Sequence, residues 1–260
     1  LKLHRSFKSK DKLTMNNYRP ISVTSILCKT MESVIRDQLL RRLESQGVLS
    51  NQQHGFTKHR SCLTNLLETF ESWTRLIDEG FGVDVIYLDY SKAFDTVPHR
   101  RLLQKLADYE ITGSVLRWIE EYLTGRKMRV RVRGHESSWV LVRSGVPQGS
   151  VLGPLLFLLY VNKLPTWIRS SIAMFADDTK IWRKISKADD ATLLQEDLNK
   201  IRTWTKTSLM DFNVDKCKVM HVNHSLGIVH PGKGWEKLQA AGGSGGARPG
   251  RNGKKRPKSG

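Results

Sequence analysis

The sequence has few cysteines and no long apolar run. Its three cysteines stand at positions 28, 62 and 217, and no two of them form a Cys-x-x-Cys pair. This odd, dispersed set argues against a disulfide framework or a zinc site and indicates a reducing compartment. The longest apolar run, residues 151–161, contains Pro154 and is too short to cross a bilayer. Because the chain starts with leucine and has no signal-peptide pattern, we expect a fragment of a longer intracellular protein without membrane association.

Acidic residues are also scarce. The chain contains 25 Asp and Glu against 43 Lys and Arg, which gives a formal charge of +18. Such an excess of positive charge favours a polyanionic partner, most simply nucleic acid. The last 18 residues, 243–260, contribute six basic residues and no acid, so the tail accounts for only part of the excess.

Hydrophobic periodicity divides the chain into helices and strands. Helical spacing of apolar residues covers 26–44 and 62–79, and a β-branched apolar run at 83–90 predicts a buried strand. Further helices are expected at 99–109, 113–123, 153–164 and 189–210, a hairpin with strictly alternating residues at 127–145, a second hairpin at 172–184, and a last strand at 216–222. This order predicts an α+β fold close to a split βαββαβ sheet, with interruptions.

The composition changes from about residue 224 onward. Residues 224–260 are rich in glycine, basic and nearly free of apolar side chains near their end. Such a segment buries too little apolar surface to offset its ordering entropy, so we expect it to be disordered.

Three aspartates stand at the ends of expected strands. Asp177 and Asp178 lie at the tip of the 172–184 hairpin, and Asp89 follows the apolar run at 83–88. Taken alone, adjacent aspartates are typical of an exposed turn. If the strands are neighbours, however, the three carboxylates converge and require cations to neutralise them. Two Mg²⁺ ions about 3.5–4 Å apart suit such oxygen ligands and the chemistry of phosphoryl transfer. The basic chain is therefore a candidate nucleotidyl transferase or nuclease.

Several segments resemble reverse transcriptases. "YLDYSKAFDTVPH" (87–99), "SGVPQGSVLGPLLFLLYVN" (144–162) and "FADD" (175–178) resemble motifs A, B and C of that family, in the family's order. "NNYRPISVTSILCKTMESVI" and "NQQHGFTKHRSCLTNL" resemble the upstream finger motifs of non-LTR retrotransposons, with the jockey and CR1 type of LINE element most alike. "FNVDKCKVMHV" (212–222) resembles the segment that follows motif C, so the resemblance covers about residues 10–223.

The resemblance implies a right-hand polymerase fold. Residues 1–223 would form fingers and palm, the palm being the split βαββαβ antiparallel sheet and the fingers helical with β hairpins. The fingers would comprise about 1–80 and 100–143, and the palm about 81–99 and 144–223. A thumb is expected to be missing, because residues 224–260 show neither a primer-grip hairpin nor thumb helices.

The same resemblance assigns the metal ligands. Asp89 and Asp177 would bind two Mg²⁺ ions, for which Mn²⁺ is an alternative. Asp178 would have a smaller coordinating role, and the carbonyl of Tyr90 would face a metal. All three aspartates count as catalytic residues in this assignment.

Other residues are assigned to the substrate. Phe94 matches the aromatic steric gate that excludes a 2′-hydroxyl, although an ordinary core aromatic is an equal alternative. Gln148 and Gly149, in "PQGS", would contact the incoming nucleotide or the template; the alternative is a helix-entry turn. Arg60 matches the finger arginine that meets the triphosphate, with Lys58 assisting it; the alternative for Arg60 is one more solvated cation in a basic chain.

A general acid that protonates pyrophosphate is the last assignment. Lys216 and Lys218 match basic positions after motif C, and the sequence does not decide between them.

The expected function is that of an RNA-directed DNA polymerase domain of a retrotransposon. It would add deoxynucleotides to the 3′-hydroxyl of a DNA primer on an RNA template, in the nucleus or the cytoplasm. One alternative is a catalytically weak or inactive remnant that only binds nucleic acid; a weaker one is a relative of group II intron or other cellular reverse transcriptases. The sequence indicates no oligomeric state.

Overall fold

The structure is a computed structural model that describes residues 2–7, 18–132 and 135–223. The expected disordered tail and the expected absence of a thumb both concern residues 224–260, which lie outside these ranges.

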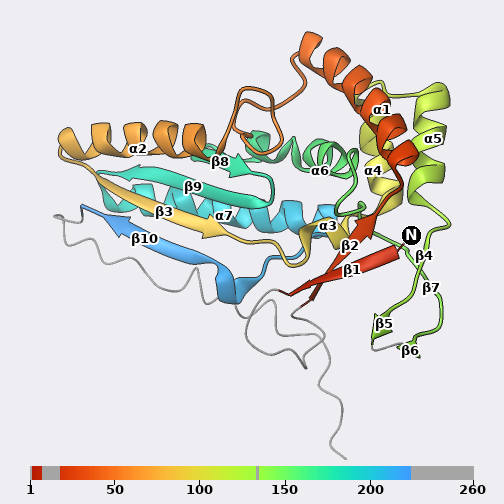
Figure 1. Ribbon diagram of the computed structural model, residues 1–260. Helices are drawn as coiled ribbons and strands as arrows, with labels where there is room; N and C mark the ends of the chain where they lie inside the picture. The colour runs from red at the N-terminus through yellow and green to blue at the C-terminus, as the bar shows by residue number, and fades with distance from the viewer. Residues whose placement is uncertain (1, 8–17, 133–134, 224–260) are drawn as a thin grey trace, which may run out of the picture. The chain divides into compact units, whose positions relative to one another are not determined.

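A four-stranded antiparallel sheet forms the centre of the fold (Figure 1). Its strands are β3 (Gly82–Leu88), β8 (Ser171–Phe175), β9 (Asp178–Ile185) and β10 (Lys218–Val222), in the order β10-β3-β9-β8. Helices connect β3 to β8, a tight turn connects β8 to β9, and α7 (Ala188–Ser208) connects β9 to β10. The expected split βαββαβ sheet is confirmed, and β3 and β9 are direct neighbours.

Helices cover both faces of this sheet, with α2 (Cys62–Asp78) on one side and α7 on the other (Figure 1). Val83 and Val85 of β3 pack with Trp73 of α2 and Trp182 of β9. The alternate residues Ile86 and Leu88 are buried as well. A strand buried on both faces is expected to be apolar throughout, which explains the continuous apolar run in its sequence.

Helix α2 turns a largely polar side toward the sheet. Ser61 caps its N-terminus by accepting a hydrogen bond from the Thr64 N–H, as a sequence of this type predicts. The side that faces the sheet carries three buried residues, Asn65, Thr69 and Trp73. Most of the apolar stripe faces outward, with exposed fractions of 63% for Leu63, 41% for Leu66, 59% for Leu67 and 53% for Phe70. The prediction of the helix is confirmed. Trp73 of its apolar stripe faces the core, whereas these four residues face outward.

Several further helices belong to the described chain. They are α1 (Ile26–Ser45), α3 (Ala93–Thr96), α4 (His99–Asp108), α5 (Gly113–Leu123), α6 (Gly153–Val161) and the short 3₁₀ helices η2 (Leu164–Trp167) and η3 (Val214–Lys216). Helix α6 is apolar on every side and almost completely buried, as its sequence indicates. Among the described residues, no helix combines the length and apolarity needed to cross a membrane.

Short antiparallel pairs of strands complete the described chain. β1 (Lys2–Phe7) pairs with β2 (Tyr18–Val23), which the sequence did not predict. β4 (Lys127–Met128) pairs with β7 (Val140–Leu141), and β5 (Arg131–Val132) with β6 (His135–Glu136). The predicted hairpin is therefore present, but it consists of two short ladders. His135 and Glu136, which were expected in the turn of this hairpin, instead form β6 and pair with β5.

Candidate active site

The three aspartates lie at the same end of adjacent strands. Asp178 is the first residue of β9, and Asp89 follows the last residue of β3. Leu88 pairs with Thr179, so extending the register by one residue places Asp89 opposite Asp178. Asp177 lies in the turn that joins β8 to β9. The sequence analysis made convergence of the aspartates depend on neighbouring strands, and β3 and β9 are such neighbours.

The segment before β10 holds Asp89 through three of its polar groups. The Asp89 N–H contacts the buried Cys217 Sγ at 3.4 Å, and the Asp89 carbonyl accepts a hydrogen bond of 2.7 Å from the Asn213 N–H. Its carboxylate accepts from the Lys216 ammonium at 2.9 and 3.1 Å. Burial raises the pKa of the Cys217 thiol, which keeps this contact uncharged. Asp89 is consequently fixed both in backbone and in side chain.

The donor set fits a hard divalent cation. Carboxylate oxygens from two adjacent strands are ligands that Mg²⁺ prefers. The Lys216 ammonium on Asp89 shows that this position already accommodates positive charge. Within the described residues, however, no three His, Cys, Asp or Glu side chains are arranged as a metal-binding group. The carboxylates at the ends of β3 and β9 are therefore suitable ligands for the expected ions. In this structure the Lys216 ammonium pairs with Asp89.

The turn before the two adjacent aspartates is in contact with the segment 52–55. Ala176 has φ +56°, in the left-handed region that disfavours residues with a Cβ. The Gln53 side chain accepts a hydrogen bond from the Ala176 N–H at 2.9 Å and donates one to its carbonyl at 3.3 Å. The sequence alone indicates no role for Gln53. The only local signal is the neighbouring Gly55, since a glycine often marks close backbone approach.

Two aromatic side chains, those of Tyr90 and Phe94, follow Asp89 in the sequence. Phe94 is half-buried and stacks on Phe157 of α6 at 4.7 Å between ring centroids, with Phe56 edge-on at 6.4 Å. Tyr90 is buried, its ring lies 4.8 Å from that of Phe212, and burial raises the pKa of its hydroxyl. Phe94 thus has packing contacts and an accessible part, so both of its expected roles stay open.

The PQGS segment lies against β2. The Gln148 carbonyl accepts a hydrogen bond of 2.7 Å from the Ser22 N–H. Gly149 has φ +93°, and a Cβ there would lie 2.8 Å from the Ser22 carbonyl oxygen. A structural need therefore accounts for this glycine. The nucleotide contacts expected of Gln148 and Gly149 stay predictions.

A buried acid joins α1 to the start of α6. The Glu32 carboxylate accepts hydrogen bonds from the N–H groups of Val151 at 2.8 Å and Leu152 at 3.0 Å. An anion at a helix N-terminus is stabilised by the unpaired N–H groups and by the helix dipole. Glu32 thereby links α1 to the residues just after PQGS, a link that no pattern in the sequence indicates.

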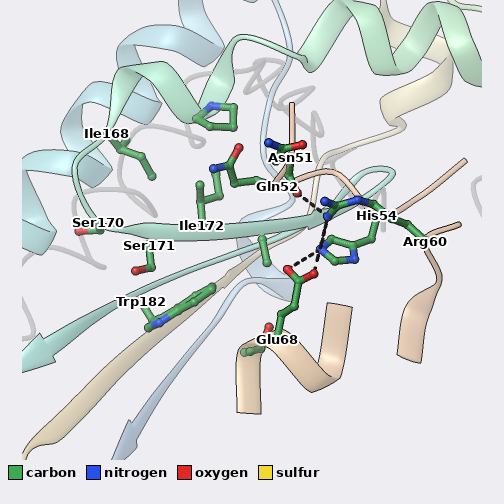
Figure 2. Close-up of a pocket in the computed structure, with 13 residues that line it drawn as sticks. Asn51, Gln52, His54, Arg60, Glu68, Ile168, Ser170, Ser171, Ile172 and Trp182 are labelled. Atoms are coloured by element: carbon green, nitrogen blue, oxygen red, sulfur yellow. Dashed lines mark hydrogen bonds and ion pairs between the residues drawn. The ribbon is translucent and has the colours of Figure 1, made fainter. Parts of the chain in front are cut away.

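Arg60 lies in a pocket beside the edge strand β8 (Figure 2). Its guanidinium donates to the Asn51 carbonyl at 2.5 Å and lies 3.1 Å from His54 Nε2 and 3.8 Å from the Glu68 carboxylate. Burial lowers the pKa of His54, although Glu68 opposes that effect. These contacts hold Arg60 against the segment that precedes α2, and Lys58 is exposed two residues earlier. Binding of a triphosphate by either residue stays a prediction.

The two candidate acids differ in their contacts. Lys216 ends η3 and pairs with Asp89, whereas Lys218 is an exposed residue at the start of β10, opposite Tyr87. Lys216 is thus the candidate that a direct ion pair brings to the aspartates.

Residues 8–242 match the family of reverse transcriptases (RNA-dependent DNA polymerases). The match covers most of the chain, and the chain belongs to this family. The combination of helices and an antiparallel sheet agrees with that membership.

Similar proteins come from mobile elements. The chain is 30% identical over 206 residues to a probable RNA-directed DNA polymerase from the transposon X-element of Drosophila melanogaster, covering 77% of this chain and 23% of that protein. It is also 30% identical over 217 residues to the RNA-directed DNA polymerase from the mobile element jockey of Drosophila funebris, covering 80% and 24%. The chain thus spans about a quarter of the length of these relatives.

Among solved structures, an apo telomerase from Candida tropicalis has a similar fold. The TM-score is 0.59 at 12% identity, over 87% of this chain and 47% of that one. This likeness supports the polymerase fold.

Proposed function

We propose that the chain is the polymerase domain of a non-LTR retrotransposon reverse transcriptase. It would transfer deoxynucleotides from deoxynucleoside triphosphates to the 3′-hydroxyl of a DNA primer paired with an RNA template. The observation that supports this most is the position of Asp89, Asp177 and Asp178 at one end of adjacent strands in a chain of this family. Action inside the cell, in the nucleus or the cytoplasm, belongs to the same proposal.

Each residue assigned to the site would have a separate role in this reaction. Asp89 and Asp177, with Asp178 and the Tyr90 carbonyl, would hold two Mg²⁺ ions, which supply charge neutralisation to phosphoryl transfer when bound. Phe94 would exclude a 2′-hydroxyl, and Gln148 and Gly149 would position the nucleotide. Arg60 and Lys58 would bind the triphosphate. Lys216 or Lys218 would protonate the departing pyrophosphate, and the contact with Asp89 favours Lys216.

The division of the chain is part of the proposal. Residues 1–80 and 100–143 would act as fingers, and residues 81–99 and 144–223 as palm. The hydrogen bonds from Ser22 to Gln148 and from Leu152 to Glu32 are, in this division, contacts between fingers and palm.

Primer extension tests the proposal. The full chain is incubated with poly(rA)·oligo(dT), thymidine triphosphate and Mg²⁺ or Mn²⁺, beside the variants Asp177→Asn and Asp189→Asn. Asp189 is an exposed acid in the first turn of α7 and serves as the matched control. We expect Asp177→Asn to lose several orders of magnitude in rate while it keeps nucleic-acid binding. Asp189→Asn should behave like the unmodified chain.

The alternative function is nucleic-acid binding without catalysis, which the formal charge of +18 favours. In that case the unmodified chain would bind RNA with an affinity that falls steeply as salt rises. It would extend no primer with either metal ion, and Asp177→Asn would be indistinguishable from it.

A further inference from the structure

The turn between β8 and β9 has a conformation that needs support. Ala176, its first residue, has φ +56°, and an L-residue with a Cβ is disfavoured there. Asp177 and Asp178 follow directly, so the backbone at Ala176 determines where both carboxylates point. Something outside the hairpin must stabilise this backbone if the aspartates are to keep one position.

The segment 52–54 runs along the outer edge of β8. The Met174 N–H donates to the Gln52 carbonyl at 2.8 Å, and the His54 N–H donates to the Met174 carbonyl at 2.9 Å. Gln53 and Met174 form a parallel bridge. The segment is thereby fixed against β8, the strand that leads into the turn.

The Gln53 side chain extends this pairing into the turn. It is buried, and its Oε1 accepts from the N–H groups of Ala176 at 2.9 Å and Gly55 at 2.8 Å. Its Nε2 donates to the Ala176 carbonyl at 3.3 Å. A side-chain amide thus bonds both backbone groups of the left-handed residue, as a peptide group of a neighbouring strand would. Glutamine provides the donor and the acceptor together at this reach, which a carboxylate does not.

Gly55 closes the contact from the other side. A Cβ at this position would lie 2.3 Å from the Ala176 nitrogen and 3.0 Å from its Cα. No side chain fits there without moving the turn. The backbone of Gly55 and the amide of Gln53 therefore enclose Ala176 together.

We propose that Gln53 is a positioning residue that holds the turn at Ala176 and thereby directs Asp177 and Asp178 for catalysis. The inference deepens the proposed polymerase function and rests on it for its kinetic consequence. Gln53 itself touches no reacting atom in this proposal. Its effect passes through the backbone of Ala176, so the segment upstream of α2 controls the geometry of the carboxylates.

The test compares the full chain with Gln53→Met, Gln53→Glu and the control Gln52→Glu. Methionine keeps the length and removes both hydrogen-bonding functions. The neighbouring Gln52 is exposed, and its side-chain oxygen accepts a hydrogen bond from the Ser50 hydroxyl. A carboxylate at position 52 could accept the same hydrogen bond. Single-turnover extension gives the rate of incorporation and the nucleotide affinity separately. Hydrogen exchange of the 174–179 peptide reports on the turn without requiring catalysis.

We expect Gln53→Met to slow incorporation by about 10- to 100-fold, since a displacement of about 1 Å has such an effect on a catalytic group. Nucleotide affinity should change little, more Mg²⁺ should be needed, and the Ala176 N–H should exchange faster. Gln53→Glu keeps the acceptor for the Ala176 N–H but loses the donor to the Ala176 carbonyl, so it should also slow incorporation and speed the exchange of the Ala176 N–H. Gln52→Glu should match the unmodified chain in every measurement.

The outcomes separate the two proposals. If the unmodified chain extends no primer, the polymerase function fails, and the exchange of Ala176 alone decides on the role of Gln53. Unchanged exchange and unchanged incorporation in Gln53→Met would overturn that role. An equal loss in Gln52→Glu would do the same, because it would show a general effect of the segment. If Gln53→Met fails to fold, slower incorporation and faster exchange of the Ala176 N–H in Gln53→Glu would support the role of Gln53, and unchanged values of both would overturn that role.

Discussion

Replacing Glu32 by alanine is expected to loosen the attachment of α1 to the PQGS region. The carboxylate is almost fully buried and accepts hydrogen bonds from the N–H groups of Val151 and Leu152. Alanine leaves both donors at the start of α6 without an acceptor and removes a negative charge from the helix N-terminus. The same change also removes the cost of burying a carboxylate, so the two effects oppose each other.

The hydrogen bonds should dominate. A hydrogen bond to a charged group contributes about 1.5–3 kcal/mol, so two bonds at the lower value give a loss of about 3 kcal/mol. For a chain of this size each kcal/mol lowers Tm by about 2–4 °C, which predicts a decrease of about 6–12 °C. Glu32→Gln keeps one acceptor oxygen but loses the charge and places an NH₂ group where the second oxygen was, so its cost should be smaller, about 1 kcal/mol.

Thermal and urea unfolding of the full chain, followed by circular dichroism, measure both values. Glu44→Ala is the matched control, because Glu44 is an exposed acid on the same helix and should change stability by less than about 0.5 kcal/mol. A loss below about 1 kcal/mol in Glu32→Ala would refute the reasoning, since the relief of desolvation would then cancel two charge-assisted bonds.

Three further outcomes follow from the geometry. Burial would raise the pKa of Asp197, but donation from the Lys200 ammonium and the Ser170 and Arg169 N–H groups lowers it on balance. Urea unfolding should therefore show a stability difference between the unmodified chain and Asp197→Asn that is complete above about pH 4 and shrinks as the pH falls further. Burial lowers the pKa of Lys105 from 10.5 to about 8. The free energy of unfolding of the unmodified chain should therefore rise relative to that of Lys105→Met as the pH increases from about 8 to 10.5. A difference that does not change with pH would contradict this. Phe94→Ala should raise the ratio of ribonucleotide to deoxynucleotide incorporation in extension assays; an unchanged ratio in an active variant would make Phe94 a packing residue.

The central sheet was predictable because its sequence signals are local. The apolar run of β3, the apolar stretches of the second hairpin and the helical spacing of α7 each reflect burial within one element. The strand order then brings Asp89 and Asp178 together, as the sequence required.

The supports of the candidate site were not predictable in the same way. Glu32 contacts Leu152 across 120 positions of sequence, and Gln53 contacts Ala176 across 123. Neither residue breaks a local pattern, because a glutamate in a helix and a glutamine in a loop are ordinary choices. Their roles arise only when distant segments meet, and hydrophobic periodicity carries no information about such polar pairs.

The outward apolar stripe of α2 bears on how the chain reaches its native state. Burial of apolar area alone favours the opposite rotation of this helix, with Leu63, Leu67 and Phe70 against the sheet. The native rotation buries Trp73 together with the polar Asn65, whose side chain donates to the Met174 carbonyl at 3.2 Å. Non-directional collapse and a directional bond therefore favour different arrangements of one helix, which is local frustration in the folding landscape. The Met174 carbonyl also accepts from the His54 N–H, so the positions of α2 and of the segment beside the turn at Ala176 depend on the same backbone group.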